Sequence, residues 1–487
     1  MILDDILHNL RTRGDDLCYV INDKRYSYAQ VYARVRAVYA VLTGWPGVSG
    51  PILVYGHKGV WMIASFLACS LAGMAYVPVD ASTPAVRVDA VIERIRPGLI
   101  LGDYACDGVP VLSEADLAVL DRDNVDIEEP ELAPDDIDYV IFTSGSTGVP
   151  KSVRVTYANL DSCVHWLVDQ TGGGPGVVLN QAVFSFDLSV ADLYIALVTG
   201  GTLVALDGPT QSDYPRLFRA LRESDATLAV MTPSFADHLL VDRSFARALL
   251  PRLRTILFCG EALSPATVAR LWERFGALDI INAYGPTECT VAVTSVRLTP
   301  DMCAGPLPLG RPKPDITVRL VDDERRDVAP GEIGEILIRG ASVAAGYVPA
   351  NRHDPGGFIE DAGEPAYLTG DLGYLRDGLL YFAGRKDRQV KYLGYRIELG
   401  DIECNLRRIP GVAKAVVGAA FGQDGTVRRL LAFVQPVPGV AVDAAALRAT
   451  LRQRLPDYMC PAIRLVERIP LTEHGKADLA ALMGAPR

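Results

Sequence analysis

Apolar residues in the middle of the chain occur in short unbroken runs, separated by longer stretches with helical spacing. Between about residues 50 and 290 the amphipathic stretches 84–95, 214–223 and 265–275 have the spacing of surface helices. The apolar runs predict eight buried strands, at 52–55, 99–101, 139–142, 177–180, 202–205, 228–231, 255–258 and 279–281. Buried strands that alternate with amphipathic helices are typical of an α/β fold, in which helices flank parallel sheets.

The pattern changes twice after this region. From 315 to 383 short strands and turns prevail, with Pro330-Gly331 and Asp377-Gly378 as hairpin signals, which predicts a small β-barrel-like subdomain. After Gly384 the pattern predicts a small α+β unit, made of a hairpin at 390–398, helix 400–408, strands 413–419 and 430–435, and helix 444–454. We therefore predict a large N-terminal domain, 1–386, followed by a small C-terminal domain, 387–487.

One uncharged segment, 60–79, is long enough to cross a membrane. Ser65, Ser70 and Gly73 interrupt it, and Pro78 lies near its end. The segment divides instead into a buried helix at about 58–72 and a buried strand at 75–80. We expect no membrane insertion.

Composition narrows the class of protein. A chain of 487 residues is too long to fold around one ordinary hydrophobic core, so two or more domains are expected. Its 49% hydrophobic residues are enough to form a core in each. The formal net charge of −11 argues against a nucleic-acid partner, which requires basic surface. Nine cysteines without a C-x-x-C pair fit neither a disulfide framework nor a zinc site. The acidic N-terminus carries no signal peptide, so a cytoplasmic location is expected.

The segment after the predicted strand 139–142 is rich in hydroxyl and glycine residues and ends in a lysine. It reads Thr-Ser-Gly-Ser-Thr-Gly-Val-Pro-Lys over 143–151. Glycines allow a backbone to approach a polyphosphate closely, and free N–H groups and hydroxyls donate to its oxygens. Because Pro150 stands where a Walker loop needs glycine, the segment is not a P-loop. An ordinary glycine-rich turn is the alternative for this segment taken alone.

Five motifs in order along the chain resemble the adenylate-forming superfamily of nonribosomal peptide adenylation domains, acyl-CoA synthetases and luciferases. They are the segment 143–151, Asn-Ala-Tyr-Gly-Pro-Thr-Glu at 282–288, Tyr-Leu-Thr-Gly-Asp at 367–371, the stretch 384–398, and Thr-Glu-His-Gly-Lys at 472–476. The segments 184–194, 231–237, 257–261 and 289–295 are similar to the D-alanine–carrier protein ligases. Some discrete adenylation enzymes of antibiotic pathways share this pattern.

The resemblance implies a reaction in two halves. A carboxylate attacks the α-phosphorus of ATP, and the thiol of a phosphopantetheine on an acyl or peptidyl carrier protein then attacks the acyl-adenylate. The ATP-binding residues carried over by motif are Thr143, Ser144, Gly145, Ser146, Thr147, Gly148, Lys151, Asn282, Ala283, Tyr284, Gly285, Pro286, Thr287, Asp371, Phe382, Arg385 and Lys476.

Several of these residues suit particular roles. Lys476 is the predicted catalytic lysine, which would span ATP and substrate carboxylate oxygens. Tyr284 suits stacking on adenine and Asp371 suits the ribose hydroxyls. Arg385 suits the ribose or phosphate, or a structural ion pair.

The same motifs also predict the ligands of Mg²⁺ and the position of the hinge. Glu288 and Thr147 are the predicted Mg²⁺ ligands, because a hard cation that bridges phosphates prefers oxygen. Asp387, in Gly-Arg-Lys-Asp, occupies the hinge position of the family.

Asp187 decides the class of substrate. It lies in an apolar stretch, where a carboxylate needs a partner, and the resemblance implies that this partner is the α-amino group of an amino acid. A helix cap for residues 188–198 is the alternative. The other predicted pocket residues are small or apolar: Leu188, Ala191, Val230, Leu257, Cys259, Gly260, Ala283, Val291 and Ala292, with Lys476 at the substrate carboxylate.

The resemblance favours D-alanine as the substrate. In the D-alanine ligases a cysteine at the position of Cys259 restricts which enantiomer fits. Ala191 and Ala283 replace an expected methionine and threonine, which enlarges the pocket. Alternatives are another small apolar amino acid for nonribosomal peptide synthesis, an acyl- or aryl-acid–CoA ligase, and a silent nucleotide-binding protein. The sequence leaves open whether the product enters cell-wall decoration or a secondary metabolite.

Overall fold

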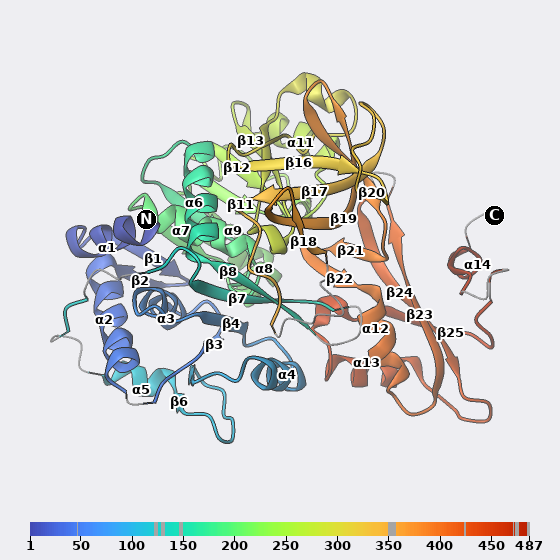
Figure 1. The fold of residues 1–487 in the computed structure, drawn as a ribbon, viewed down its shortest axis with the longest axis horizontal. Coiled ribbons are helices and arrows are strands. Elements are labelled where there is room, and N and C mark those ends of the chain that lie inside the picture. The colour runs from blue at the N-terminus through green and yellow to red at the C-terminus, as the bar shows by residue number, and fades with distance from the viewer. Residues whose placement is uncertain are drawn as a thin grey trace. The chain divides into compact units, whose positions relative to one another are not determined.

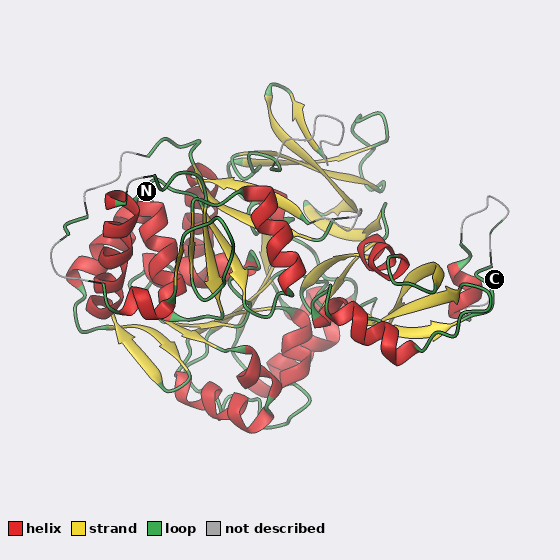
Figure 2. Cartoon of the chain, turned by 90° about the horizontal axis from the view of Figure 1, so that it is seen from below, coloured by secondary structure: helices red, strands yellow, loops and turns green. Residues whose placement is uncertain are grey.

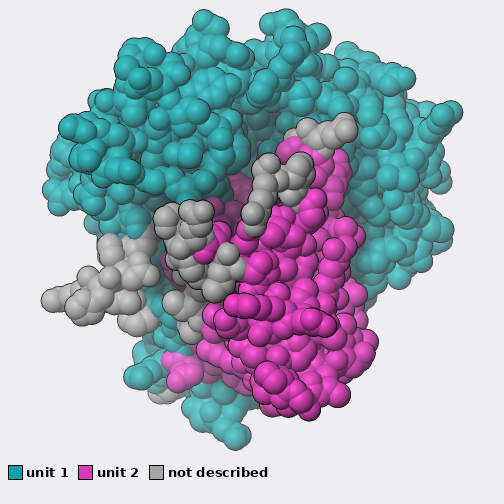
Figure 3. Space-filling view, turned by 90° about the vertical axis from the view of Figure 1, so that its right-hand side faces the viewer, with its two compact units in different colours: residues 1–81, 94–141, 152–386 teal, residues 82–93, 142–151, 387–487 magenta. Residues whose placement is uncertain are grey.

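A computed structural model describes residues 1–45, 47–120, 125–127, 132–145, 150–348, 357–422, 425–470, 472 and 477–484. The chain forms two compact units, coloured separately in Figure 3. The first unit comprises Met1–Ala81, Arg94–Ile141 and Ser152–Lys386. The second unit comprises Ser82–Glu93, Phe142–Lys151 and Asp387–Arg487, so that it includes the glycine-rich segment as well as the C-terminal residues.

A nine-stranded sheet forms the centre of the first unit. Its strands run parallel from β13 to β1, and antiparallel strands close both edges. The order is β15 (Arg311–Pro312), β14 (Thr294–Arg297), β13 (Asp279–Tyr284), β12 (Thr255–Phe258), β11 (Leu228–Met231), β9 (Val177–Asn180), β10 (Thr202–Ala205), β1 (Leu17–Ile21) and β2 (Lys24–Ser27).

A six-stranded sheet holds most of the earlier strands. Its order is β6 (Val111–Leu112), β5 (Leu99–Leu101), β3 (Ile52–Gly56), β4 (Tyr76–Asp80), β7 (Ile137–Thr143) and β8 (Lys151–Thr156). The strands from β6 to β7 pair in parallel. Residues of both sheets meet in one hydrophobic cluster, to which Val54 and Tyr139 contribute from this sheet and Val230 from the nine-stranded sheet.

Helices cover both faces of the nine-stranded sheet, as Figures 1 and 2 show. The cluster shared by the two sheets includes residues of α1 (Ile2–Thr12), α2 (Tyr28–Gly44), α3 (Val60–Leu71), α6 (Tyr157–Thr171) and α7 (Leu188–Val198). A second cluster, on the opposite face, includes residues of α9 (Tyr214–Ser224), α10 (Pro233–Leu239) and α11 (Pro265–Phe275). Strand side chains alternate between the clusters: Val230 faces the first, and Ala229 and Met231 face the second.

An antiparallel sheet completes the first unit and corresponds to the predicted β-barrel-like subdomain. Its order is β16 (Ile316–Val321), β17 (Gly334–Gly340), β19 (Glu364–Arg376) and β18 (Phe358–Asp361), with β20 (Leu379–Arg385) on β19. Asp377 and Gly378 form the β19–β20 turn with φ values of 53° and 72°, as the hairpin signal predicts. Pro330-Gly331 lies instead in the long loop 322–333 between β16 and β17.

The C-terminal part of the second unit is the predicted α+β arrangement. A hairpin of β21 (Gln389–Tyr392) and β22 (Tyr395–Glu398) precedes α12 (Leu399–Arg407), and β23 (Val412–Phe421), β24 (Val427–Pro436) and β25 (Ala462–Leu465) form a sheet with α13 (Ala444–Arg452). The pattern did not predict β25 or α14 (Leu479–Met483). Segment 82–93 of this unit holds most of α4 (Ala85–Ile95), whose Arg87 pairs with the buried Asp401.

The α/β fold class is therefore confirmed, and so are the eight predicted strands, although β3, β7 and β13 extend beyond the predicted limits. The uncharged segment 60–79 is helix α3, of 12 residues, followed by β4. Across the described part of the chain, no helix is long and apolar enough to cross a bilayer.

Candidate functional site: a small apolar pocket wall beside Asp187

Eight of the predicted pocket residues belong to the large hydrophobic cluster that includes residues of both sheets. Alternation along β11, β12 and β13 directs Val230, Leu257 and Ala283 into it. The first turns of α7 add Leu188 and Ala191 to the same cluster, and Cys259, Val291 and Ala292 complete it. Each of these eight side chains is at most 3% exposed. Gly260 follows Cys259 with a φ of 94°, a conformation that favours glycine.

Asp187 lies at the entrance to α7 and is 8% exposed. It occupies the position of a helix cap, but its backbone is helical, with φ −60° and ψ −26°, and its side chain makes no capping hydrogen bond. The capping alternative is therefore wrong. A nearly buried carboxylate next to the cluster of small residues fits a role in holding a cation.

Tyr139 is a polar residue of this cluster that the sequence did not single out. Its side chain is wholly buried on β7, and its hydroxyl has no hydrogen-bond partner among the described residues. Burial raises the pKa of Tyr139 well above its ordinary value, and the charges of Cys163 and Asp187 raise it further. Its place in an apolar strand carried no local signal, because only the fold brings it near Asp187.

The motif 282–288 continues from β13 into a 3₁₀ turn, Thr287–Cys289. The side-chain amide of Asn282 donates a hydrogen bond of 2.7 Å to the carbonyl of Pro308. The Tyr284 hydroxyl donates to Asp371 Oδ2 at 2.7 Å, and Arg385 pairs with Asp371 Oδ1. Burial raises the pKa of Tyr284 well above its ordinary value, and the charge of Asp371 adds to the effect.

Three of the predicted nucleotide residues therefore form one connected group, Tyr284, Asp371 and Arg385. The structural ion pair foreseen for Arg385 is present, and its side chain is 11% exposed. Phe382, on β20, is 39% exposed. The roles of these residues toward a nucleotide stay predictions.

Glu288 is wholly buried at the centre of the 3₁₀ turn. Its Oε1 accepts a hydrogen bond of 2.6 Å from the Tyr347 hydroxyl, and its carbonyl accepts one of 2.9 Å from the Ala344 amide. Tyr347, which orients this carboxylate, lies 59 positions further along the chain, and none of the sequence motifs includes Tyr347. A single oriented carboxylate fits Mg²⁺, which a protein binds through one or two carboxylates together with substrate phosphates. No group of three acidic, histidine or cysteine ligands occurs in the described ranges.

The glycine-rich segment belongs to the second unit. Thr143 ends β7, and its buried Oγ1 has no hydrogen-bond partner among the residues that the structure describes. The Ser144 hydroxyl donates to the Arg396 carbonyl at 2.7 Å and accepts from the Glu398 amide at 3.1 Å, so it contacts β22. Lys151 begins β8. Of the other predicted residues, Ser146, Thr147 and Gly148 lie outside the described residues.

The predicted hinge lies between two residues that are held by different partners. Lys386 pairs with Asp323 at 2.6 Å and Glu335 at 3.0 Å, within the first unit. Arg388 pairs with Glu403 at 2.8 Å, within the second. Asp387 is exposed and accepts a hydrogen bond from the Gln389 amide. The predicted catalytic residue Lys476 lies outside the described residues.

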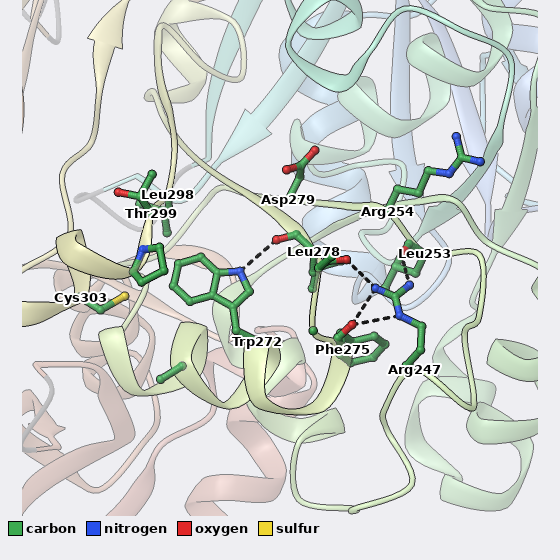
Figure 4. A pocket seen from close by; sticks show the side chains of 14 residues that line it. Arg247, Leu253, Arg254, Trp272, Phe275, Leu278, Asp279, Leu298, Thr299 and Cys303 are labelled. Atoms are coloured by element: carbon green, nitrogen blue, oxygen red, sulfur yellow. Dashed lines mark hydrogen bonds between the residues drawn. The ribbon is translucent and has the colours of Figure 1, made fainter.

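Figure 4 shows a cavity of about 1040 Å³ in the first unit, beside α11. It contains none of the predicted site residues. The Arg247 guanidinium is held by the carbonyls of Phe275 and Ala277, and the Trp272 indole N–H donates to the Leu278 carbonyl at 2.9 Å. These polar groups hold the loop 276–279, so the Arg247 guanidinium and the Trp272 indole already have backbone partners.

The chain matches two protein families. Residues 7–348 match the family described as AMP-binding enzyme, and residues 401–476 match the AMP-binding enzyme C-terminal domain. The chain belongs to the AMP-binding enzyme family.

Among its relatives is the D-alanine–D-alanyl carrier protein ligase of Bacillus licheniformis, 38% identical over 98% of both chains. The enzyme of the same name from Bacillus thuringiensis is 39% identical over 96% of both. A solved structure of an NRPS protein with adenylation and PCP domains, bound to a vinylsulfonamide inhibitor, superposes with a TM-score of 0.83. It is 27% identical and covers 99% of this chain and 84% of the other.

Proposed function

We propose that this protein is an AMP-forming amino acid–carrier protein ligase that acts on D-alanine. In the first half-reaction a D-alanine carboxylate oxygen attacks the α-phosphorus of ATP, and the bond to pyrophosphate breaks. In the second, the phosphopantetheine thiol of a carrier protein attacks the carbonyl carbon, and AMP leaves with the electrons of the acyl–phosphate bond. The near-full-length relatives of that name support the substrate and the carrier.

The observation that carries the proposal is the position of Asp187. Its carboxylate is nearly buried and makes no capping hydrogen bond to α7, and the adjacent Leu188 belongs to the cluster that holds the eight predicted pocket side chains. A substrate ammonium would suit such a carboxylate, whereas a fatty or aryl acid has no cationic group to pair with it. The buried Tyr139 hydroxyl, which has no hydrogen-bond partner among the described residues, would accept a hydrogen bond from the same ammonium.

The group of Tyr284, Asp371 and Arg385 would bind the nucleoside of ATP. Tyr284 presents an aromatic ring whose hydroxyl is already held by Asp371 at 2.7 Å, which limits its rotation. The carboxylate of Asp371 can accept hydrogen bonds from ribose hydroxyls, either in addition to those from Tyr284 and Arg385 or in their place. Thr143, with its orphan hydroxyl, would donate to a phosphate oxygen.

Mg²⁺ would be held by Glu288, with Thr147 as a second oxygen ligand, and would neutralise charge on the phosphoryl oxygens. Tyr347 keeps the Glu288 carboxylate in one orientation before any cation arrives. Lys476 would neutralise charge where the carboxylate meets the α-phosphate, and Asp387 would be the hinge between the half-reactions.

A panel of amino-acid-dependent pyrophosphate exchange tests the proposal, with D-alanine, L-alanine and propionate as substrates. Propionate has the size of alanine without the ammonium. We expect D-alanine to be preferred strongly over propionate. Asp187→Asn should reduce kcat/KM for D-alanine by about ten- to a hundredfold, since a hydrogen bond to a charged group contributes roughly 1.5–3 kcal/mol. Propionate exchange should not fall with it.

Asp213→Asn is a matched control, because Asp213 also lies at a helix N-terminus and caps α9 through the Arg216 amide. Asparagine caps helices as well as aspartate, so this variant should keep the normal exchange rate. Transfer of radiolabelled D-alanine to a purified carrier protein then tests the second half-reaction. Equal use of D-alanine and propionate by the unmodified enzyme would favour the acyl-acid ligase alternative.

A further inference from the structure

Two consecutive residues after the Glu288 turn have an unusual backbone. Thr290 and Val291 have φ values of 55° and 66°, in the left-handed region, although both are β-branched. Branched residues rarely adopt this conformation, and they keep it only where the surroundings impose it. Thr290 is 0% exposed and Val291 is 3% exposed. The pair leads directly into Ala292, so the turn forms part of the predicted pocket wall.

Donors and acceptors from three other segments hold this turn. The Thr290 hydroxyl donates to the Ser342 carbonyl at 2.9 Å. The Cys163 thiol, from α6, donates to the Thr290 carbonyl at 3.2 Å, and the Cys259 thiol donates to the Val291 carbonyl at 3.7 Å. Burial raises the pKa of Cys163 to about 12, so the thiol keeps the proton that it donates.

The turn also presses against the end of β13. A side chain at Gly285 would place its Cβ 2.7 Å from the Ala292 Cα and 2.9 Å from the Val291 carbonyl oxygen. Such distances require glycine at this position. The turn is therefore fixed on one side by backbone contact with Gly285 and on the other by the two thiols and the Thr290 hydroxyl.

We propose that Cys163 and Thr290 are positioning residues that set the width of the amino-acid pocket, and with it the choice of enantiomer and side-chain size, by holding the turn 290–291. This inference rests on the proposed function, in which Val291 and Ala292 line the pocket. Neither residue needs to touch the substrate. Protein interiors are close-packed, so a small displacement of this wall changes the space left for one methyl group.

The test compares Cys163→Ala, Cys163→Ser and Thr290→Val with the unmodified full-length enzyme. Alanine removes the thiol donor, serine keeps a donor, and valine keeps the branched shape of threonine without its hydroxyl. Cys69→Ala is the matched control, because Cys69 is also wholly buried in the same cluster but lies on α3. Pyrophosphate exchange gives kcat and KM for D-alanine, L-alanine and D-2-aminobutyrate, and KM for ATP.

Cys163→Ala and Thr290→Val should each lower the ratio of kcat/KM for D-alanine over L-alanine by about three- to tenfold, as the loss of one hydrogen bond implies. The change should lie in KM for the amino acid, with KM for ATP within about twofold of normal. Cys163→Ser should restore the ratio to within about twofold, and Cys69→Ala should leave it unchanged.

Unchanged ratios in both Cys163→Ala and Thr290→Val would overturn the inference. So would an equal loss in Cys69→Ala, which would indicate general loosening of the core. Should Cys163→Ala fail to fold, Thr290→Val and Cys163→Ser decide the matter alone. Failure of the proposed function looks different: the unmodified enzyme then activates no small amino acid, and the inference falls with it.

Discussion

Lys58 is a wholly buried lysine whose replacement by methionine should change how stability depends on pH. Its ammonium donates to the carbonyls of Leu206 at 2.8 Å, Gln181 at 2.9 Å and Asn180 at 3.4 Å, at the ends of β9 and β10. Each carbonyl has a second donor, from the Gln211 side chain or the Leu206 amide. Lys58→Met therefore leaves no carbonyl without a partner and fills similar volume.

The size of the effect follows from the pKa of Lys58. Burial lowers this pKa from 10.5 to about 7, although the charges of Asp192, Asp80 and Asp207 oppose the change. Between these two values the unfolded chain binds more protons than the folded chain, so the free energy of unfolding rises with pH. The contribution of Lys58 to stability is lowest below pH 7, where folding must keep a buried ammonium charged.

Each pKa unit corresponds to about 1.36 kcal/mol, so raising the pH from 7 to 9 adds at most roughly 2.7 kcal/mol. Coupling to Asp192, which is itself buried and has a raised pKa, reduces the expected gain to about 1–2 kcal/mol. Lys58→Met lacks this gain. Its free energy of unfolding relative to the unmodified protein should therefore fall by about 1–2 kcal/mol between pH 7 and pH 9.

Urea unfolding followed by tryptophan fluorescence measures this difference. All four tryptophans lie before residue 387, and Trp61 lies three positions after Lys58, so the signal reports the first unit. Lys24→Met, on the exposed part of β2, is the control and should show no such trend. A difference between Lys58→Met and the unmodified protein that stays constant from pH 7 to pH 9 would refute the reasoning, because Lys58 would then titrate alike in both states.

Four further substitutions test the proposed roles. Lys476→Ala should slow adenylation by about two to three decades, roughly 3–4 kcal/mol, while transfer from preformed acyl-adenylate to the carrier suffers much less; equal losses in the two single-turnover assays would contradict its role. Asp387→Pro fixes φ and should spare pyrophosphate exchange but slow carrier loading, and normal loading would place the hinge elsewhere. The unmodified enzyme should prefer D-alanine over L-alanine by about ten- to a few hundredfold in the exchange assay, and Cys259→Ala should reduce this preference. Equal activation of the two enantiomers by the unmodified enzyme would contradict the role of Cys259. Tyr347→Phe should lower the free energy of unfolding by about 1.5–3 kcal/mol and raise the Mg²⁺ concentration needed for half-maximal exchange; an unchanged Mg²⁺ titration would separate Tyr347 from the metal site.

Most of the α/β framework was predictable from the sequence, because its signals are local. A buried parallel strand needs an apolar run, and the runs at 99–101, 177–180, 202–205, 228–231 and 255–258 coincide with observed strands. The Asp377-Gly378 turn was predictable for the same reason, since the left-handed conformation of a tight hairpin favours that pair. The 322–333 loop was not, because Pro330-Gly331 is compatible with many turns.

The motifs indicated which residues carry the chemistry, but only the tertiary structure decided their surroundings. Asp187 stands where a capping residue would stand, and its backbone geometry excludes that role. Only the fold brings Tyr139, Cys163 and Tyr347 to the candidate site residues, because each contacts partners that are distant in the chain.

The turn at Thr290 and Val291 shows the physical reason. Their β-branched side chains favour extended backbone, and the sequence alone predicts no left-handed pair there. Distant partners, the Ser342 carbonyl and the thiols of Cys163 and Cys259, compensate for this conformation. Local preference thus determined the strands, while long-range hydrogen bonds and close packing decided the shape of the predicted pocket wall.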